Sequence, residues 1–343
     1  MKAALVLLVL AACETGVGAM AAADCALAPR PVLALDFGSR YADGDATRSE
    51  VDAGALDAAQ DAIRPVDAFL RDLTDAANKV FDPQQDAAAI ADCVLGQMAV
   101  WAQAGALADL ASDTAQLTIG SRLAGFGLVA LQVLPHARND DDARAVTAWL
   151  TRAVQAQALW WEDAAPPGAR QGNLRAWAAL AAATTSALTG DPALRGWAAW
   201  SFGRILCSAA PDGSLPQEMR RGRLALQYQL HAIAPLAVGV LLLDRQGVSL
   251  TATCDDALAR IVAFGVDDLD DGRATQAITG QVQSYFDGSD TVQDFELAFI
   301  EAYLLLDGVA GRDRLDQLVQ DRRPLGYSKL GGNQTLIWRG MGF

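Results

Sequence analysis

The sequence predicts an all-α protein built from antiparallel helical hairpins. Three observations support the prediction: long segments rich in Ala and Leu, almost no alternating strand pattern after Phe37, and short loops between the apolar segments. Helices joined by short loops are antiparallel neighbours, so they form either a solenoid or a closed ring. The 343 residues, 52% of them hydrophobic, are ample for one large core.

Start signals and periodicity place the helices. Asp82-Pro83 and Asp191-Pro192 are each predicted as an N-cap followed by proline at the first helical position. No repeat of about 34 residues is visible, which argues against a tetratricopeptide array. No shift in composition marks a second domain, so one domain is expected over residues 24–343. The expected helices are 53–80, 83–107, 115–134, 141–162, 172–189, 192–209, 215–243, 253–265 and 289–307.

Residues 1–23 have the pattern of a signal peptide. A basic Lys2 precedes an apolar run that is too short to span a membrane as a mature helix, and small residues follow. We expect a periplasmic or secreted bacterial protein. The stretch LAAC, which ends at Cys13, offers the alternative of an outer-membrane lipoprotein anchored at that cysteine. No later apolar run reaches about 18 residues, so no membrane span is expected.

Four cysteines remain after such a leader: Cys25, Cys93, Cys207 and Cys254. In an oxidising compartment they predict two disulfides, for which three pairings are possible. The alternative is four buried free thiols.

Charge and composition exclude several functions. The formal charge of -14 argues against nucleic acid as a partner, although converging arginines could still bind a polyanion locally. The two histidines, His136 and His231, have no close His or Cys neighbour in the sequence, which argues against a metal site. Gly125 and Gly127 lie inside a helical pattern with no strand before them, so they are not a dinucleotide fingerprint. We expect no cofactor.

One helical segment, RRGRLALQYQLHA (220–232), concentrates Arg, Tyr and His. Arg221 and Tyr228 are two helical turns apart and are predicted to project from one face, with His231 one turn beyond Tyr228. An arginine beside a phenol favours the phenolate and lowers its pKa. The structural alternative is an arginine that snorkels past a half-buried core tyrosine.

Five segments resemble, in order, the family 5 polysaccharide lyases, which are alginate or poly-mannuronate lyases. LPQEMRRGRLALQYQLHAIAPLA is similar to L-P-x-E-x-x-R-x-x-R-A-L-x-Y-H-x-Y-A-L-x-P-L in that family, and QGNLRAWAA stands where the family has N-N-H-x-Y-W-A-A. The other three matches are CVLGQMAVWAQAGAL, SRYADGDATR and the pair AFIEAY with KLGGNQT.

The resemblance implies an incomplete α/α toroid with a cleft for an acidic polysaccharide, acting as a monomer. It also implies β-elimination at the 4-linked uronate, in which the carboxylate is neutralised, the C5 proton removed and O4 protonated. By position, Asn173, Arg221 and Tyr228 fall on the catalytic Asn, Arg and Tyr. Arg40 and Tyr41 fall on lid residues.

Further residues are expected to bind substrate. Trp177 falls on a family Trp, either as a sugar-stacking platform or as core. His231 is expected to contact substrate. Arg175, Arg220 and Arg223 are expected to line or flank the cleft, the alternative being a solvated helix face, and Arg48 and Lys329 match basic positions of the family. Cys25 and Cys93 match family cysteines, which favours their pairing and leaves Cys207 with Cys254.

The chain departs from the family pattern at its catalytic histidine, where Leu174 stands. Gly172 replaces the first Asn, Ala176 a Tyr, and His231 a second Tyr. In mannuronate the C5 proton and O4 leave from one face, so Tyr228 could serve as base and then acid; in guluronate they leave from opposite faces. We therefore expect a lyase for mannuronate-rich alginate that acts by syn elimination and is poor on guluronate. The alternative is a catalytically dead relative that binds an acidic exopolysaccharide during export or turnover.

Overall fold

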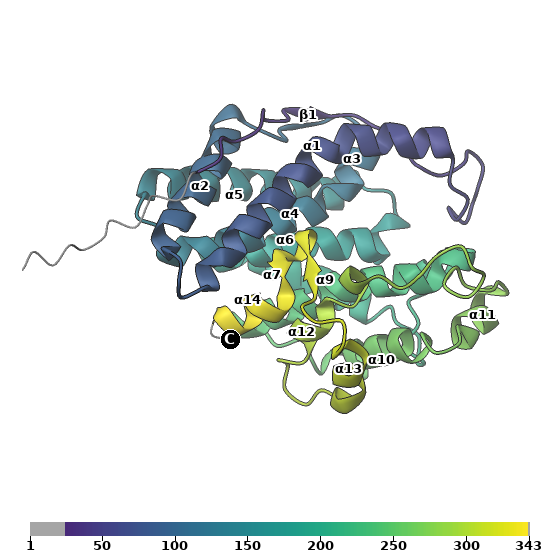
Figure 1. The fold of residues 1–343 in the computed structure, drawn as a ribbon. Coiled ribbons are helices and arrows are strands. Elements are labelled where there is room, and N and C mark those ends of the chain that lie inside the picture. Colours follow the sequence, from purple (N-terminus) through teal and green to yellow (C-terminus); the bar gives the residue numbers. More distant parts are fainter. Residues whose placement is uncertain (1–24, 342–343) are drawn as a thin grey trace, which may run out of the picture.

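The computed structural model describes residues 25–341, which are mostly helical (Figure 1). Residues 1–23, predicted as a signal peptide, and with them Cys13, lie outside the described residues. The α-helices are α1 Ala53–Ala77, α2 Ala87–Ala104, α3 Asp113–Thr118, α4 Gly120–Val133, α5 Asp140–Asp163, α6 Asn173–Thr189, α7 Pro192–Leu206, α8 Pro216–Met219, α9 Ala225–Arg245, α10 Thr253–Asp267, α11 Arg273–Thr279, α12 Phe299–Tyr303, α13 Arg312–Val319 and α14 Gln334–Gly340.

Short 3₁₀ helices and two small strand pairs complete the described chain. β1 Ala34–Leu35 pairs in parallel with β2 Asp109–Leu110, and β3 Gly326–Tyr327 pairs antiparallel with β4 Gly332–Asn333. The 3₁₀ helices are η1 Asn78–Phe81, η2 Leu134–His136, η3 Ala169–Gln171, η4 Gly222–Leu224, η5 Asp294–Glu296 and η6 Ser328–Leu330.

The helices form the two layers of an incomplete α/α toroid. α4, α6 and α9 are buried along most of their length and pack in series, α4 on α6 and α6 on α9. α5 and α7 cover α6 from outside, and α10 covers both α7 and α9. The C-terminal segment returns across the opening, where η6 and β4 contact α1 (Figure 1). The predicted all-α toroid is confirmed.

Glycines set how closely the inner helices approach. A Cβ at Gly120 of α4 would lie 2.8 Å from the backbone of Ala178 in α6, and one at Gly127 would lie 2.4 Å from Oγ1 of Thr184. Because real Cβ contacts are longer than this, only glycine permits the spacing. The start of α6 is thereby fixed relative to α4.

Several predicted boundaries are wrong. Asp191 caps α7 by accepting the N–H groups of Ala193 and Leu194, as expected. Asp82, however, accepts from Gln84 N in a turn, and Asp86 caps α2 instead. The expected helix 215–243 is interrupted before Ala225, where Gly222 has φ 55°. The expected helix 289–307 is reduced to η5 and α12 because its first half is polar loop.

Within residues 25–341, three helical stretches are long and apolar enough, by length and composition, to cross a membrane, although no apolar run of about 18 residues was expected. They are Ala87–Ala104, Asp113–His136 and Gly222–Arg245. Their most apolar windows are 50%, 72% and 89% buried inside the protein. The packing of the toroid accounts for their apolar composition.

Two disulfides join the four cysteines of the described chain. Cys25 bonds Cys93, which lies within α2, with Cα atoms 5.5 Å apart, and Cys207 bonds Cys254, with Cα atoms 5.3 Å apart. Both favoured pairings are confirmed, and the free-thiol alternative is wrong. The first bond ties the N-terminal segment, which continues through β1 toward Arg40 and Tyr41, to the body of the toroid.

Candidate active site

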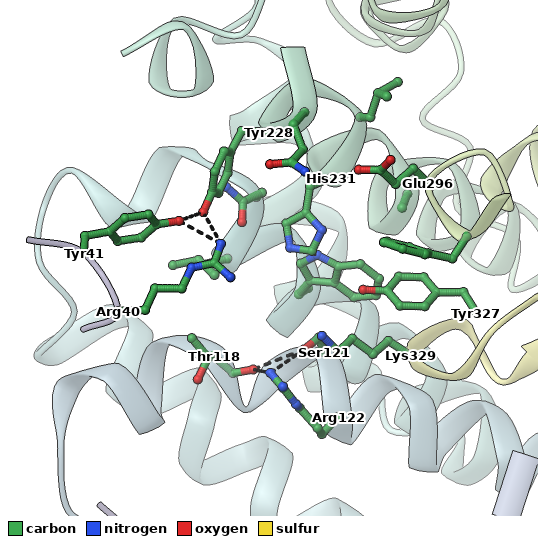
Figure 2. A pocket seen from close by; sticks show the side chains of 17 residues that line it. Arg40, Tyr41, Thr118, Ser121, Arg122, Tyr228, His231, Glu296, Tyr327 and Lys329 are labelled. Carbon is green, nitrogen blue, oxygen red and sulfur yellow. Dashed lines mark hydrogen bonds between the residues drawn. The ribbon is translucent and has the colours of Figure 1, made fainter. Parts of the chain in front are cut away.

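A polar cavity lies between the inner helices and two further segments, the one before α1 and the one around η6 (Figure 2). Its volume is about 340 Å³. Six of the sequence-predicted site residues line it: Arg40, Tyr41, Asn173, Trp177, Tyr228 and His231. Both segments singled out in the sequence, at the start of α6 and along α9, therefore face one site.

Tyr228 is the centre of a cluster of cations and hydroxyls. Nη2 of Arg40 donates to the hydroxyl of Tyr228 at 2.9 Å and to that of Tyr41 at 2.8 Å, and the two hydroxyls contact each other (Figure 2). The guanidinium carbon of Arg221 lies 3.9 Å from the centroid of the Tyr228 ring and 4.8 Å from that of Tyr41. Arg221 reaches this place from the turn before α9, not from the regular helix that the spacing predicted.

The cations and hydroxyls around Tyr228 favour its phenolate form. Burial by itself would raise the pKa of the Tyr228 phenol, but the charges of Arg40 and Arg221, with hydrogen bonds from Tyr41 and Arg40, hold it below its ordinary value. The pKa of Tyr41 is instead raised to about 12, by burial and then by the neighbouring Tyr228. Tyr41 therefore keeps its proton where Tyr228 loses its own, and in that state the Tyr41 hydroxyl donates to Tyr228.

Asn173 is held by a buried carboxylate. Its main-chain N–H donates to Oε1 of Glu218 at 2.7 Å, and its Nδ2 donates to Oε2 at 2.8 Å. Glu218 is 1% exposed and belongs to α8, a helix of four residues. Burial raises the pKa of Glu218 to about 7, although the two Asn173 hydrogen bonds and the charge of Arg221 oppose the rise. Sequence reasoning did not single out Glu218.

His231 projects into the pocket, with Tyr228 and Arg40 on one side of its ring and Tyr327 on the other (Figure 2). The indole Nε1 of Trp177 donates to Nε2 of His231 at 3.1 Å. Since an indole can only donate, Nε2 is an acceptor, and the neutral ring carries its hydrogen on Nδ1. Burial, and then nearby cations led by Lys329, lower the pKa of His231 to about 3. His231 is thus a neutral donor in this geometry.

Trp177 supports that histidine and offers no open stacking face. Its side chain is 1% exposed, with the Tyr327 ring edge-on at 5.8 Å. Of the two interpretations of Trp177, as a sugar-stacking platform or as core, the structure supports core.

The C-terminal segment supplies two pocket residues: Lys329, which matches a basic position of the family pattern, and Tyr327, which sequence reasoning did not place in the site. Lys329 and Tyr327 line the cavity on the side away from Tyr228 (Figure 2). Burial, and then the charge of Arg122, lower the pKa of the Lys329 amine to about 7. Arg122, on α4, is held by Asp67 at 2.8 Å. Only the resemblance of KLGGNQT to the family had pointed to Lys329.

Arg175, which was expected to line or flank the cleft, does not line this cavity. Its side chain is fully buried between α5, α6 and α7, where Nη2 pairs with Glu162 at 2.5 Å and donates to Ser201 at 3.0 Å. The guanidinium also lies 4.6 Å from the ring centroid of Trp200. The side chain projects from the opposite side of α6 because it lies two residues from Asn173, about 200° around the helix.

The other arginines near the site divide between two environments. Arg220 and Arg221, with Arg48, line a second hollow of about 230 Å³. Arg223 instead donates to Ser289 at 2.9 Å and lies 3.6 Å from Asp287. Arg220 therefore flanks the site as expected, and Arg223 is engaged by an acidic loop.

Taken together, the site is a cleft between the inner helices and two non-helical segments, in which Arg40 and Arg221 lie against Tyr228. The family model for alginate lyase matches residues 41–275. The chain therefore belongs to the alginate lyase family. The resemblance seen in the motifs is confirmed.

Named relatives match along almost the whole chain. An alginate lyase of Pseudomonas paraeruginosa is 26% identical over 324 residues, which cover 92% of this chain and 86% of that protein. An alginate lyase of Pseudomonas putida is 26% identical over 323 residues, covering 92% and 84%.

Solved structures agree on the fold. Alginate lyase A1-III of Sphingomonas species A1 superposes with a TM-score of 0.69 at 19% identity, covering 90% of this chain and 85% of that one. A point variant of A1-III in complex with a tetrasaccharide gives a TM-score of 0.73 at 20% identity, with 91% and 85% covered.

Proposed function

We propose that this protein is a polysaccharide lyase that cleaves a polyuronate, preferring mannuronate-rich alginate, by syn β-elimination. The observation that carries the proposal is the Tyr228 hydroxyl, held between Arg40 and Arg221 beside Asn173. Family membership and the alginate lyases among the relatives support it. The intact proton-transfer cluster favours an enzyme over a dead binding protein.

The chemistry follows from the residues present. Asn173 and the cations neutralise the uronate carboxylate, which makes the C5 proton more acidic. The phenolate of Tyr228 removes that proton; the C4–O4 bond breaks as the C4=C5 double bond forms; and the Tyr228 hydroxyl then returns the proton to O4. Arg40 and Tyr41 stabilise the phenolate by donating to its oxygen. One residue thus serves both proton steps on one face of the sugar.

The pocket suits an anionic polymer despite the acidic chain. Arg40, Arg122 and Lys329 line it, with Glu296 as the carboxylate among its lining residues, and burial raises the pKa of Glu296. This local cation excess offsets a net charge of -14. Export to the periplasm or beyond is part of the proposal, supported by the two disulfides.

The test compares polymers that differ in configuration. Poly-mannuronate and poly-guluronate differ at C5, and each is incubated with the mature protein while ultraviolet absorbance is followed, because elimination creates a conjugated unsaturated uronate. Absorbance should rise at least tenfold faster with poly-mannuronate, since a second base is absent from the proposed mechanism. Equal rates would contradict syn elimination by Tyr228. No rise on either polymer would contradict the lyase itself.

A further inference from the structure

The start of α6 has a feature that the proposed reaction does not explain. Gly172 is the N-cap of a 17-residue helix, yet it has no side chain with which to cap it. Glu218, 45 residues later in the chain, supplies the acceptor instead by binding the Asn173 main-chain N–H. A carboxylate at a helix N-terminus is favourable because it faces the positive end of the helix dipole.

Capping accounts for the hydrogen bond of Oε1 of Glu218 but not for the one that Oε2 accepts. Oε2 accepts from Nδ2 of Asn173 at 2.8 Å, so one carboxylate holds both the backbone and the side chain of this residue. Oδ1 of Asn173 is buried and finds no partner among the described residues. A buried acceptor without a partner costs about 1–3 kcal/mol, so folding alone does not favour this amide orientation. The carboxylate imposes it.

Gly172 is what allows the carboxylate to come so close. A Cβ at this position would lie 2.7 Å from Oε1 of Glu218 and 2.8 Å from Cγ of Gln217. Gln217 can move aside, but Glu218 is fixed by its two bonds to Asn173. Any larger residue at 172 would displace the carboxylate or the start of α6.

We propose that Glu218 is a positioning residue of the lyase reaction: it fixes the side-chain amide of Asn173 so that the remaining N–H of Nδ2 meets the carboxylate of the bound uronate. Gly172 is the residue that makes the contact possible. This inference rests on the proposed function, because it acts through the residue assigned to the substrate carboxylate. Glu218 itself does not touch the reacting atoms.

The isosteric change Glu218→Gln separates positioning from capping. Glutamine keeps one acceptor for the Asn173 main-chain N–H and nearly the same volume, but it cannot also accept from Nδ2. A residue that only caps α6 would tolerate the change. A positioning residue would not, so we expect kcat on poly-mannuronate to fall about tenfold with the melting temperature little changed, as for loss of a charge-assisted hydrogen bond.

The decisive measurement is a double-mutant cycle with Asn173→Ala. We expect Asn173→Ala to lower kcat about a hundredfold, and adding Glu218→Gln to lower it by no more than a further factor of about two, because the positioned group is already gone. If the kcat of the double variant fell by the product of the two single-variant factors, the proposal would be overturned. Full activity in Glu218→Gln would also overturn it.

A backbone variant tests the same contact without altering either residue. Gly172→Ala should lower kcat about tenfold by displacing the carboxylate, whereas Gly203→Ala in α7, where a Cβ has open space, should not change it. Should the unmodified protein show no turnover, the proposed function fails. In that case the same double-mutant cycle is measured through the Kd for oligo-mannuronate. If the binding free energies lost in Glu218→Gln and Asn173→Ala simply add in the double variant, the positioning role is contradicted as well.

Discussion

The pocket has two principal helical walls, and they relate differently to the family pattern. The wall formed by the turn before α9 and by α9 itself keeps Arg221 and Tyr228 and brings them together, with guanidinium and ring 3.9 Å apart. The wall at the start of α6 keeps Asn173 but has Gly172 and Leu174 where the family has an Asn and a His. The proton-transfer wall is retained, and the carboxylate-binding wall is rebuilt.

The rebuilt wall is completed by residues from elsewhere in the fold. Glu218, which the family pattern also has, packs against Gly172, and His231 of α9 presents a neutral ring to the cavity that Leu174 also lines. Leu174 packs partly on the small apolar cluster of Trp161, Ala165 and Ala178, an environment unsuited to an imidazole. The comparison teaches that polar groups lost from one helix can be supplied by another facing the same cavity.

The largest expected effect tests the retained wall. Tyr228→Phe removes the only atom that takes and returns the proton in the proposed mechanism, so turnover of poly-mannuronate should fall about 10³-fold or more. Binding of oligo-mannuronate should persist, since Arg40 and Arg221 remain. Tyr303→Phe, a change at a buried tyrosine outside the pocket, is the matched control and should keep the full rate. Substantial turnover in Tyr228→Phe would move the base to another residue.

The next effect tests the rebuilt wall through His231. Asparagine places an N–H near the position of Nδ1, whereas glutamine places its amide near Nε2 and can still accept from Trp177. If the Nδ1 donor matters, His231→Asn should stay within about threefold of the native kcat/KM, and His231→Gln should lose about tenfold. The reverse order would assign the useful atom to Nε2 and contradict the orientation fixed by Trp177.

The smallest effect concerns Lys329, where the family pattern has arginine. Because its pKa is about 7, the amine is charged below that pH and loses its charge as the pH rises above it. KM for poly-mannuronate should therefore rise about fivefold between pH 6 and pH 9, as a charge-assisted contact is lost. Lys329→Arg should remove this rise because arginine stays charged. A rise that persists in Lys329→Arg would come from another group.

The sequence by itself determined the helical class and the capping of α7 by Asp191, and its motifs pointed to Tyr228 as the tyrosine proposed for proton transfer. These depend on local patterns: hydrophobic period, turn chemistry and motifs whose residues lie within a few turns. It also predicted that Arg40 and Tyr41 would reach the site, although only by resemblance. The contact between Arg40 and Tyr228 joins residues 188 positions apart, which no periodicity expresses.

Only the tertiary structure decided which side of each helix faces the cavity and which side chains lie around positions 172 and 174, where the chain departs from the family pattern. It placed Arg175 in a buried pair with Glu162, joined Glu218 to Asn173, and brought Lys329 from the C-terminal segment to the wall away from Tyr228. The physical reason is that the inner helices are buried on nearly every side, so their apolar pattern does not mark a cleft-facing stripe. The side of each inner helix that faces the cavity is instead determined by packing distances, which glycines such as Gly120 and Gly172 set.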